Sequence, residues 1–201
     1  VQLAYDDDYT SDSPADLGTL TTTGLTPTDS RESAIVADLV AGDYTAILRG
    51  KTNGVGLVEI YDITGSRLSK FVNISTRAKV EPGDNGALIA GFIVEAPDGQ
   101  AGTPQTVLIR ALGPSLSGSG IVGALADPTI DFYRGSQLIL SNDNWKTDNQ
   151  TGIQATGNPP TNDKESAILV TLDPGSYSAV IRGQHKPTGF ALVDVYQNPE
   201  S

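Results

Sequence analysis

The chain has 201 residues, and 13 Lys and Arg against 24 Asp and Glu give a formal net charge of −11 at pH 7. This acidic balance, with no basic run, argues against nucleic acid and anionic membranes as partners, because both favour clustered Lys and Arg. Since there is no Cys, the sequence excludes disulfides and thiolate nucleophiles, and no apolar run approaches the roughly 20 residues that cross a bilayer.

The first residues combine an apolar run with an acidic loop. The run consists of Val1, Gln2, Leu3, Ala4 and Tyr5, and residues 6–8 are three consecutive Asp. Adjacent carboxylates repel one another when no cation lies among them. The segment is therefore a candidate strand followed by a candidate cation loop.

Residues 27–62 have the periodicity of strands. Ser33, Ile35, Ala37 and Leu39 fall on one face of 33–39, and residues 43–50 alternate in the same way. Asn53-Gly54 is a typical hairpin turn between 43–50 and 55–62. We expect three strands here, at 33–39, 43–50 and 55–62, and no helix longer than one or two turns anywhere in the chain.

The middle of the chain has the same strand-and-turn character. Apolar or alternating runs occupy residues 70–74, 86–96 and 105–112, and Pro-Gly and Asp-Gly turns separate them. Residues 113–126 form a Gly/Ser connector, and residues 126–135 are expected to supply a further strand. Strand-length runs at this spacing indicate a sandwich or jelly roll.

An internal repeat organises the chain. Residues 27–62 return as residues 160–197, and 12 of the 24 aligned positions in 27–50 and 160–183 are identical. Upstream, residues 1–12 are similar to residues 136–148. The sequence therefore predicts an all-β protein of two tandem β-sandwich or jelly-roll-like modules, built from an internal duplication. We expect a first module at 1–64, an intervening β segment at 65–118 that packs with one module, and a second module at 119–201.

The first module is expected to lack its opening strand. Residues 126–135 precede the second copy, and nothing equivalent precedes Val1. Either residues 63–118 fill that place, or another chain does, or the chain is a fragment. An exposed strand edge recruits strands from other chains, so the sequence predicts that Val1–Tyr5 is an intersubunit assembly strand.

Two matching loops are candidate calcium ligands. Ca²⁺ binds six to eight oxygens, which clustered Asp and Asn side chains and loop carbonyls can provide. The alternative is that these residues are ordinary turn formers that bond their own backbone. The candidate ligands are Asp6, Asp7, Asp8, Asn142, Asp143 and Asn144.

Several motifs resemble known secreted repeats. The series ADPTIDFY (126–133), SNDNW (141–145), PTNDKESAI (160–168) and LDPGSYSAVIRG (172–183) resembles repeats of large secreted bacterial proteins, as does VLIRALGPSL (107–116). Residues 119–197 are also distantly similar to bacterial pre-peptidase C-terminal domains, which are calcium-associated jelly-roll modules of secreted proteases and collagenases. The resemblance implies an extracellular or cell-surface β-sandwich without catalytic residues.

These observations lead to a structural function and one alternative. Neither GxSxG nor a phosphate-binding loop is present, so we expect no enzyme. The expected protein is a subunit of an extracellular filament or surface assembly that polymerises with itself by strand pairing or donation. The alternative is an adhesive or targeting module that binds polysaccharide or matrix protein, with the single Trp145 as its aromatic face.

Overall fold

The computed structural model describes residues 1–64, 71–95, 102–185 and 187–197. The chain divides into two compact units, Val1–Lys70 (unit 1) and Phe71–Ser201 (unit 2), and each is described by itself. No helix in the described parts of the chain is long and apolar enough to cross a membrane.

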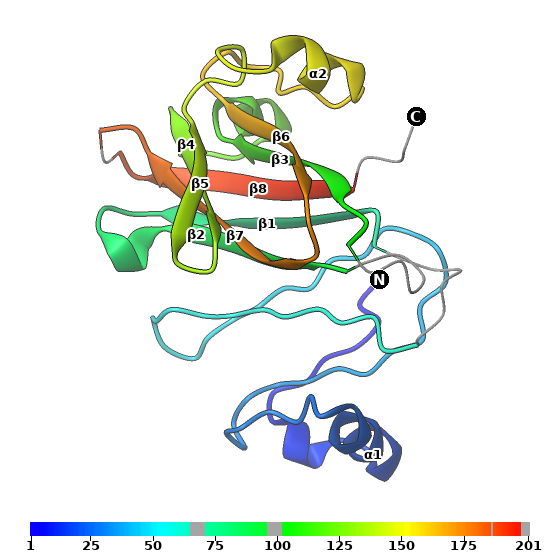
Figure 1. Ribbon diagram of the computed structural model, residues 1–201. Helices are drawn as coiled ribbons and strands as arrows, with labels where there is room; N and C mark the ends of the chain where they lie inside the picture. Colours follow the sequence, from blue (N-terminus) through cyan, green and yellow to red (C-terminus); the bar gives the residue numbers. More distant parts are fainter. Residues whose placement is uncertain (65–70, 96–101, 186, 198–201) are drawn as a thin grey trace. The chain divides into compact units, whose positions relative to one another are not determined.

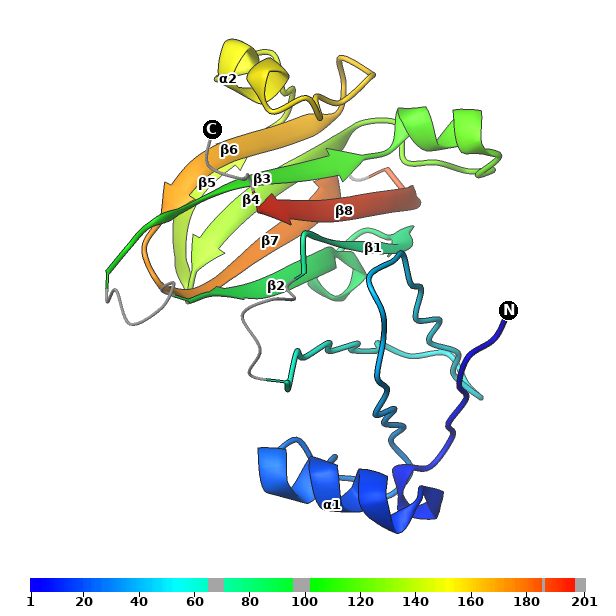
Figure 2. The same cartoon turned by 90° about the vertical axis from the view of Figure 1, so that its right-hand side faces the viewer.

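Unit 2 is a sandwich of two antiparallel four-stranded sheets (Figures 1 and 2). One sheet has the order β1-β8-β3-β6 and the other has the order β2-β7-β4-β5. The strands are β1 (Asn73–Val80), β2 (Leu88–Val94), β3 (Gln105–Leu112), β4 (Pro128–Arg134), β5 (Gln137–Asn142), β6 (Ser166–Leu172), β7 (Gly175–Gly183) and β8 (Gly189–Gln197).

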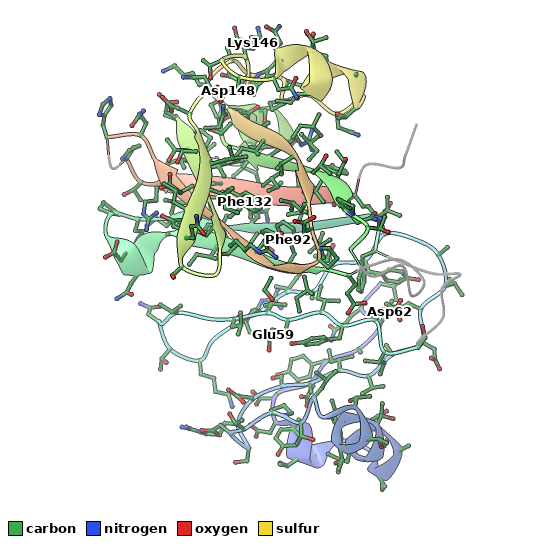
Figure 3. The ribbon with its side chains drawn as sticks, in the orientation of Figure 1. Glu59, Asp62, Phe92, Phe132, Lys146 and Asp148 are labelled. Carbon is green, nitrogen blue, oxygen red and sulfur yellow. The ribbon has the colours of Figure 1, made fainter. Side chains whose placement is uncertain are left out.

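The core of unit 2 lies between the inner faces of the two sheets. Alternate residues point inward, as the period of a strand requires: Val107, Ile109 and Ala111 of β3 are all buried. Three stacked rings, Phe92, Phe132 and Tyr177, fill the space over β2, β4 and β7, with centroids 5.6–6.0 Å apart. Phe92 and Phe132 are labelled in Figure 3. Burial of these aromatic and aliphatic faces is the main stabilising contribution to the sandwich.

A second, smaller apolar cluster covers the outer face of β3 and β6. Leu108 and Ala167 point outward from these strands and pack against Trp145 and Ile153. Ile153 lies on the short helix α2 (Gln150–Ala155), which begins where the Asn149 side chain accepts a hydrogen bond from the Gly152 N–H. The loop and helix between β5 and β6 are therefore held onto the sheet by apolar packing.

The expectation of an all-β, two-sheet sandwich is confirmed in unit 2. In one sheet, β1 and β3 from the segment 65–118 alternate with β8 and β6 from 119–201, and in the other sheet β2 pairs with β7, so the two segments form one sandwich rather than neighbouring blocks. The predicted connector at 113–126 contains the 3-10 helix η4 (Pro114–Ser119), and a further 3-10 turn, η2 (Asp84–Gly86), precedes β2.

Unit 1 differs from the sequence prediction. Among its described residues, 1–64, there is no strand, and the three predicted strands at 33–39, 43–50 and 55–62 run as irregular chain (Figure 1). The prediction of a β-sandwich at 1–64 is therefore wrong for the described structure. Strands need hydrogen-bonded neighbours, and residues 1–64 include no counterparts of β1 to β4 to supply them.

Unit 1 also contains a helix that the sequence prediction missed. After the 3-10 turn η1 (Tyr9–Ser11), helix α1 (Pro14–Thr23) begins at Ser13, whose side chain accepts a hydrogen bond from the Asp16 N–H. Gly24 ends the helix in the left-handed conformation at φ 73°. Pro at the first position and Gly after the last are ordinary helix signals, and the sequence has both, at Pro14 and Gly24.

Candidate functional site

Two hydrogen bonds recur at matching positions in the loops of the two copies. In unit 2, the Ala167 N–H donates to Asn142 Oδ1 (3.0 Å) and the Ser166 hydroxyl donates to the Asp143 carbonyl (2.7 Å). In unit 1, the Ala34 N–H donates to Asp6 Oδ2 (2.8 Å) and the Ser33 hydroxyl donates to the Asp7 carbonyl (2.9 Å). Because the partners of each bond recur in both copies, the repeated sequence itself carries the residues that form this loop.

Further contacts of the loop recur at matching positions. The backbone N–H of Trp145 donates to the Glu165 carbonyl, as that of Tyr9 donates to the Glu32 carbonyl, both at 2.9 Å. Further along the repeat, the Tyr177 hydroxyl donates to the Asp173 carbonyl at 2.8 Å. At the matching position in unit 1, the Tyr44 hydroxyl donates to the Val40 carbonyl at the same distance.

The strand segments of the two copies differ sharply in burial. Ile168 is 6% exposed and its counterpart Ile35 is 56% exposed. Ile181 is fully buried, whereas Leu48 is 56% exposed. Tyr177 and Tyr44 are 5% and 45% exposed. Unit 1 thus presents as surface the side chains that form the core of unit 2, and exposed apolar groups of this extent are typical of interaction sites.

Two polar contacts in unit 2 join the copy at 160–197 to β3 and the loop after it. The first centres on Glu165, which is fully buried. Its Oε1 accepts hydrogen bonds from the Gly113 N–H (3.1 Å), the Ser115 N–H (2.9 Å) and the Ser115 hydroxyl. Its Oε2 accepts from the Asn162 N–H (3.2 Å). These hydrogen bonds attach the Gly-Pro-Ser loop that follows β3 to Glu165, which directly precedes β6.

The second contact is an ion pair between β3 and β8. The Arg110 guanidinium binds the Asp194 carboxylate through two hydrogen bonds, of 2.9 and 2.7 Å, and also donates to the Tyr196 hydroxyl at 2.9 Å. The guanidinium lies 4.8 Å from the centre of the Tyr196 ring. Burial raises the pKa of the Asp194 carboxyl, while Arg110 opposes that shift. The buried Asp194 carboxyl therefore depends on the Arg110 charge to stay ionised.

Within residues 1–64, unit 1 contains the acceptors of both contacts without counterparts of the donors Arg110, Gly113 and Ser115. Glu32 corresponds to Glu165, and its Oε2 accepts from the Thr28 and Asp29 N–H groups at 3.1 and 3.2 Å. Glu59 and Tyr61 correspond to Asp194 and Tyr196, and here the tyrosine hydroxyl donates to Glu59 Oε1 at 3.1 Å (Glu59 is labelled in Figure 3). This hydrogen bond raises the pKa of Tyr61. All three side chains are exposed.

The predicted calcium ligands serve mainly as hydrogen-bond partners in the two loops. Asp7 Oδ2 pairs with the Lys51 ammonium at 2.8 Å, and Asp143 Oδ2 accepts from the Gln184 amide at 2.7 Å. Asn142 donates to Asp148 Oδ2 at 2.7 Å and, less closely, to the Asn144 carbonyl. Within the described residues, no three His, Cys, Asp or Glu side chains gather as metal ligands. The donor set does not form a calcium cage, and calcium binding stays a prediction.

The remaining sequence predictions lie in different environments. Val1–Tyr5 is exposed in unit 1 and lies outside any strand, so its assembly role stays a prediction. Trp145 is only 4% exposed, and its indole N–H donates to the Asn162 carbonyl at 3.2 Å. An open hollow of about 370 Å³ adjoins the 142–144 loop, lined in part by Asp131, Asn142 and Gln184.

Sequence reasoning missed Arg110, Glu165 with its Gly113 and Ser115 donors, and the Asp194–Tyr196 pair as a set. These residues are far apart in the sequence, and only the sheet order brings them together. The signal that was present is the recurrence of their acceptors: Glu32 with Glu165, and Glu59 with Asp194.

Comparisons with known proteins show a distant likeness to a solved structure. No protein-family model matches the sequence, and no curated protein matches it. Among solved structures, the chain is similar to the pre-peptidase C-terminal domain of collagenase from Bacillus anthracis, with a TM-score of 0.38 and 12% sequence identity. The match covers 62% of this chain and 89% of that one, so the chain is distantly similar to that domain.

Proposed function

We propose that this chain is a non-enzymatic structural protein of the cell surface or extracellular space, joined to further copies of itself by β-strand complementation. Unit 2 serves as a complete sandwich, and unit 1 serves as an incomplete one that a neighbouring subunit completes. Head-to-tail contacts of this kind do not close on themselves and generate filaments.

One observation carries the proposal: matched side chains are core in unit 2 and surface in unit 1. Ile168 and Ile35 occupy the same repeat position, yet only the first is buried. Each large aliphatic side chain contributes about 1.5–3 kcal/mol when it is buried. The free energy available from covering the unit 1 positions is therefore a strong drive for association.

The net charge of −11 is compatible with this role. Mutual repulsion keeps acidic filaments soluble and apart at moderate salt. The adhesive alternative has less support, because the aromatic face that it would use belongs to Trp145, which is packed against Ile153 and Leu108.

Light scattering across a concentration series tests the proposal, with negative-stain electron microscopy of the same samples. We expect mass to rise with concentration and elongated particles to appear. Deleting Val1–Tyr5 should weaken assembly, because this run aligns with β5, an edge strand that pairs with β4 in unit 2. Val122→Ser, at an exposed apolar residue of unit 2, is the matched control. A monomer at every concentration would contradict the proposal.

A further inference from the structure

We infer that unit 1 is a receptor for one particular kind of strand: a β3-type segment carrying the pattern Arg-x-x-Gly-x-Ser, donated by a neighbouring module of the same repeat type. This inference rests on the proposed function and deepens it by naming the occupant. It follows from three independent features of the repeat.

The first feature is a gap in the strand order. In unit 2, β6 and β8 are not neighbours, because β3 lies between them and pairs with both. The unit 1 segments 33–39 and 55–62 are the sequence counterparts of β6 and β8. If they form the same sheet, an inserted strand must hydrogen-bond to both of them. An inserted strand with two partners gains twice the backbone pairing of an edge strand.

The second feature is charge complementarity along that strand. In unit 2, Arg110 of β3 is opposite Asp194 of β8 in the sheet register. Unit 1 has Glu59 at the matching position, with Tyr61 two residues later. In unit 2, the carboxylate and the aromatic ring at the matching positions, Asp194 and Tyr196, contact the Arg110 guanidinium. An arginine in the occupant is therefore the cation that fits this pair.

The third feature is the carboxylate that caps the occupant's end. Glu165 Oε1 receives both N–H groups of the loop that follows β3, three and five residues after Arg110. Glu32 keeps the local half of this arrangement, since its Oε2 bonds Thr28 and Asp29. In unit 2, a Cβ at Gly113 would lie 2.2 Å from the Leu125 carbonyl oxygen, which explains the Gly in the pattern.

A synthetic peptide with the sequence of residues 102–119 tests the inference on the full chain. We expect the peptide to bind with one-to-one stoichiometry and to protect the amides of 33–39 and 55–62 from hydrogen exchange. A scrambled peptide of the same composition should protect neither segment. Protection confined to unit 2, which would mean exchange with its own β3, overturns the inference, and so does absence of protection.

A double-mutant cycle locates the contact. Replacing the peptide's Arg110 by Ala, or Glu59→Gln in the chain, should each weaken binding at least about tenfold. The two changes together should cost far less than the product of the separate losses, because they remove the same interaction. Glu81→Gln, at an exposed carboxylate of unit 2 that pairs with Lys79, is the matched control. Fully additive losses would contradict the predicted Arg–Glu59 pair.

A covalent version guards against poor peptide solubility. Residues 102–119 are placed ahead of Val1 through a flexible Gly/Ser linker, which raises the effective concentration to roughly the millimolar range. Slowed exchange at 33–39 and 55–62 is again expected, and unchanged exchange overturns the inference. If the chain self-associates but does not bind the segment, the inferred occupant is wrong and the proposed self-assembly is supported. If the chain binds the segment but stays monomeric, the inferred receptor role of unit 1 is supported and the proposed self-assembly is contradicted.

Discussion

Residues 27–62 and 160–197 share half of their aligned positions in the ungapped part, yet one copy is irregular chain and the other is three strands. The loops of the two copies agree: a side-chain oxygen at the same repeat position, from Asp6 in unit 1 and Asn142 in unit 2, accepts a hydrogen bond from the matching backbone N–H, at 2.8 Å and 3.0 Å. The strand segments do not agree, because they form strands in unit 2 only. What differs is the presence of β1 to β4 around the second copy.

The comparison separates what is local from what is not. The loop bonds join residues 23 to 28 positions apart, but both partners of each bond recur in the two copies, so each copy carries its own partners. A strand does not, because its hydrogen bonds and half of its packing come from other segments. The same residues therefore form strands in unit 2 only.

The largest effect is expected from removing the contact that only unit 2 possesses. Arg110→Ala leaves the Asp194 carboxylate, with 3% of its side chain exposed, without its cation, and should lower the unfolding free energy of unit 2 by about 3–5 kcal/mol. Urea unfolding followed by Trp145 fluorescence measures it, because the single tryptophan lies in unit 2.

Two further variants make this result interpretable. Arg110→Lys keeps a charge but loses the two-point geometry, so it should lie between wild type and alanine even if the alanine variant does not fold. Arg31→Ala removes an exposed ion pair with Asp29 in unit 1 and should leave the Trp145 transition unchanged. A wild-type midpoint for Arg110→Ala would show that the buried pair does not stabilise the sandwich.

A matched pair of core positions gives the next effect. Ile181→Ala opens a cavity between the sheets and should cost about 2–5 kcal/mol. Leu48→Ala, at the same repeat position, should change hydrogen exchange in unit 1 little, because Leu48 is exposed. When the 102–119 segment is added, the Leu48 variant should bind it measurably more weakly than the wild type does. Equal losses for both variants without the segment would mean that unit 1 is already packed as a sandwich.

The same contrast explains how far sequence reasoning reaches. Alternation at Tyr177, Ala179 and Ile181 correctly predicts a strand and its inward face. The identical pattern at Tyr44, Ala46 and Leu48 predicts a strand that is not formed. The alternation itself does not distinguish the two segments. Periodicity reports which face a strand would bury, whereas the partner that buries it is encoded elsewhere.

The candidate site has the same dependence on distant segments. The loop acceptors could be found from the repeat, since Glu32 and Glu165 are aligned. Their significance could not, because Arg110 and Gly113 meet the second copy only through the sheet order. By contrast, helix α1 was missed although its start at Ser13-Pro14 and its stop at Gly24 are local signals. That error came from giving strand periodicity priority over capping residues.

Tyrosine titration provides a smaller, pH-dependent test. The pKa of Tyr196 is raised first by burial and then by the Asp194 charge, whereas that of Tyr61 is raised by its hydrogen bond to Glu59. A folded pKa above the unfolded value of about 10 adds stability below pH 10, and this stability is lost as pH rises through the folded pKa. Tyr196→Phe should flatten the alkaline decline of unit 2 stability.

The two causes can be separated by titrating the ring carbons by NMR. Glu59→Gln should lower the pKa of Tyr61 and leave that of Tyr196 unchanged. Asp194→Asn should lower the pKa of Tyr196, but not to its ordinary value, because burial remains the larger cause. Equal responses of both tyrosines to Glu59→Gln would contradict the independence of the two copies.

Calcium gives the smallest expected effect and the finest distinction between the copies. Asp143 Oδ1 is buried and has no hydrogen-bond partner among the described residues, and its neighbour Gln184 is neutral. At the matching place in unit 1, the Lys51 ammonium lies 2.8 Å from Asp7. A bound ammonium and a bound Ca²⁺ exclude one another at the same carboxylate, since both are cations. Calorimetric titration of calcium should therefore detect at most one weak site, at residues 142–144.

The variant that tests this distinction removes the competing charge. Calcium at about ten times its dissociation constant should stabilise unit 2 by about 1.4 kcal/mol, and Asp143→Asn should abolish that gain. Lys51→Gln gives the loop at 6–8 the neutral neighbour that Gln184 provides in unit 2, and should create or strengthen a second site there. If Lys51→Gln leaves the stoichiometry unchanged while the first site persists, the ammonium is not what separates the two loops. If calcium binds neither loop in any variant, their hydrogen bonds alone specify the shared geometry.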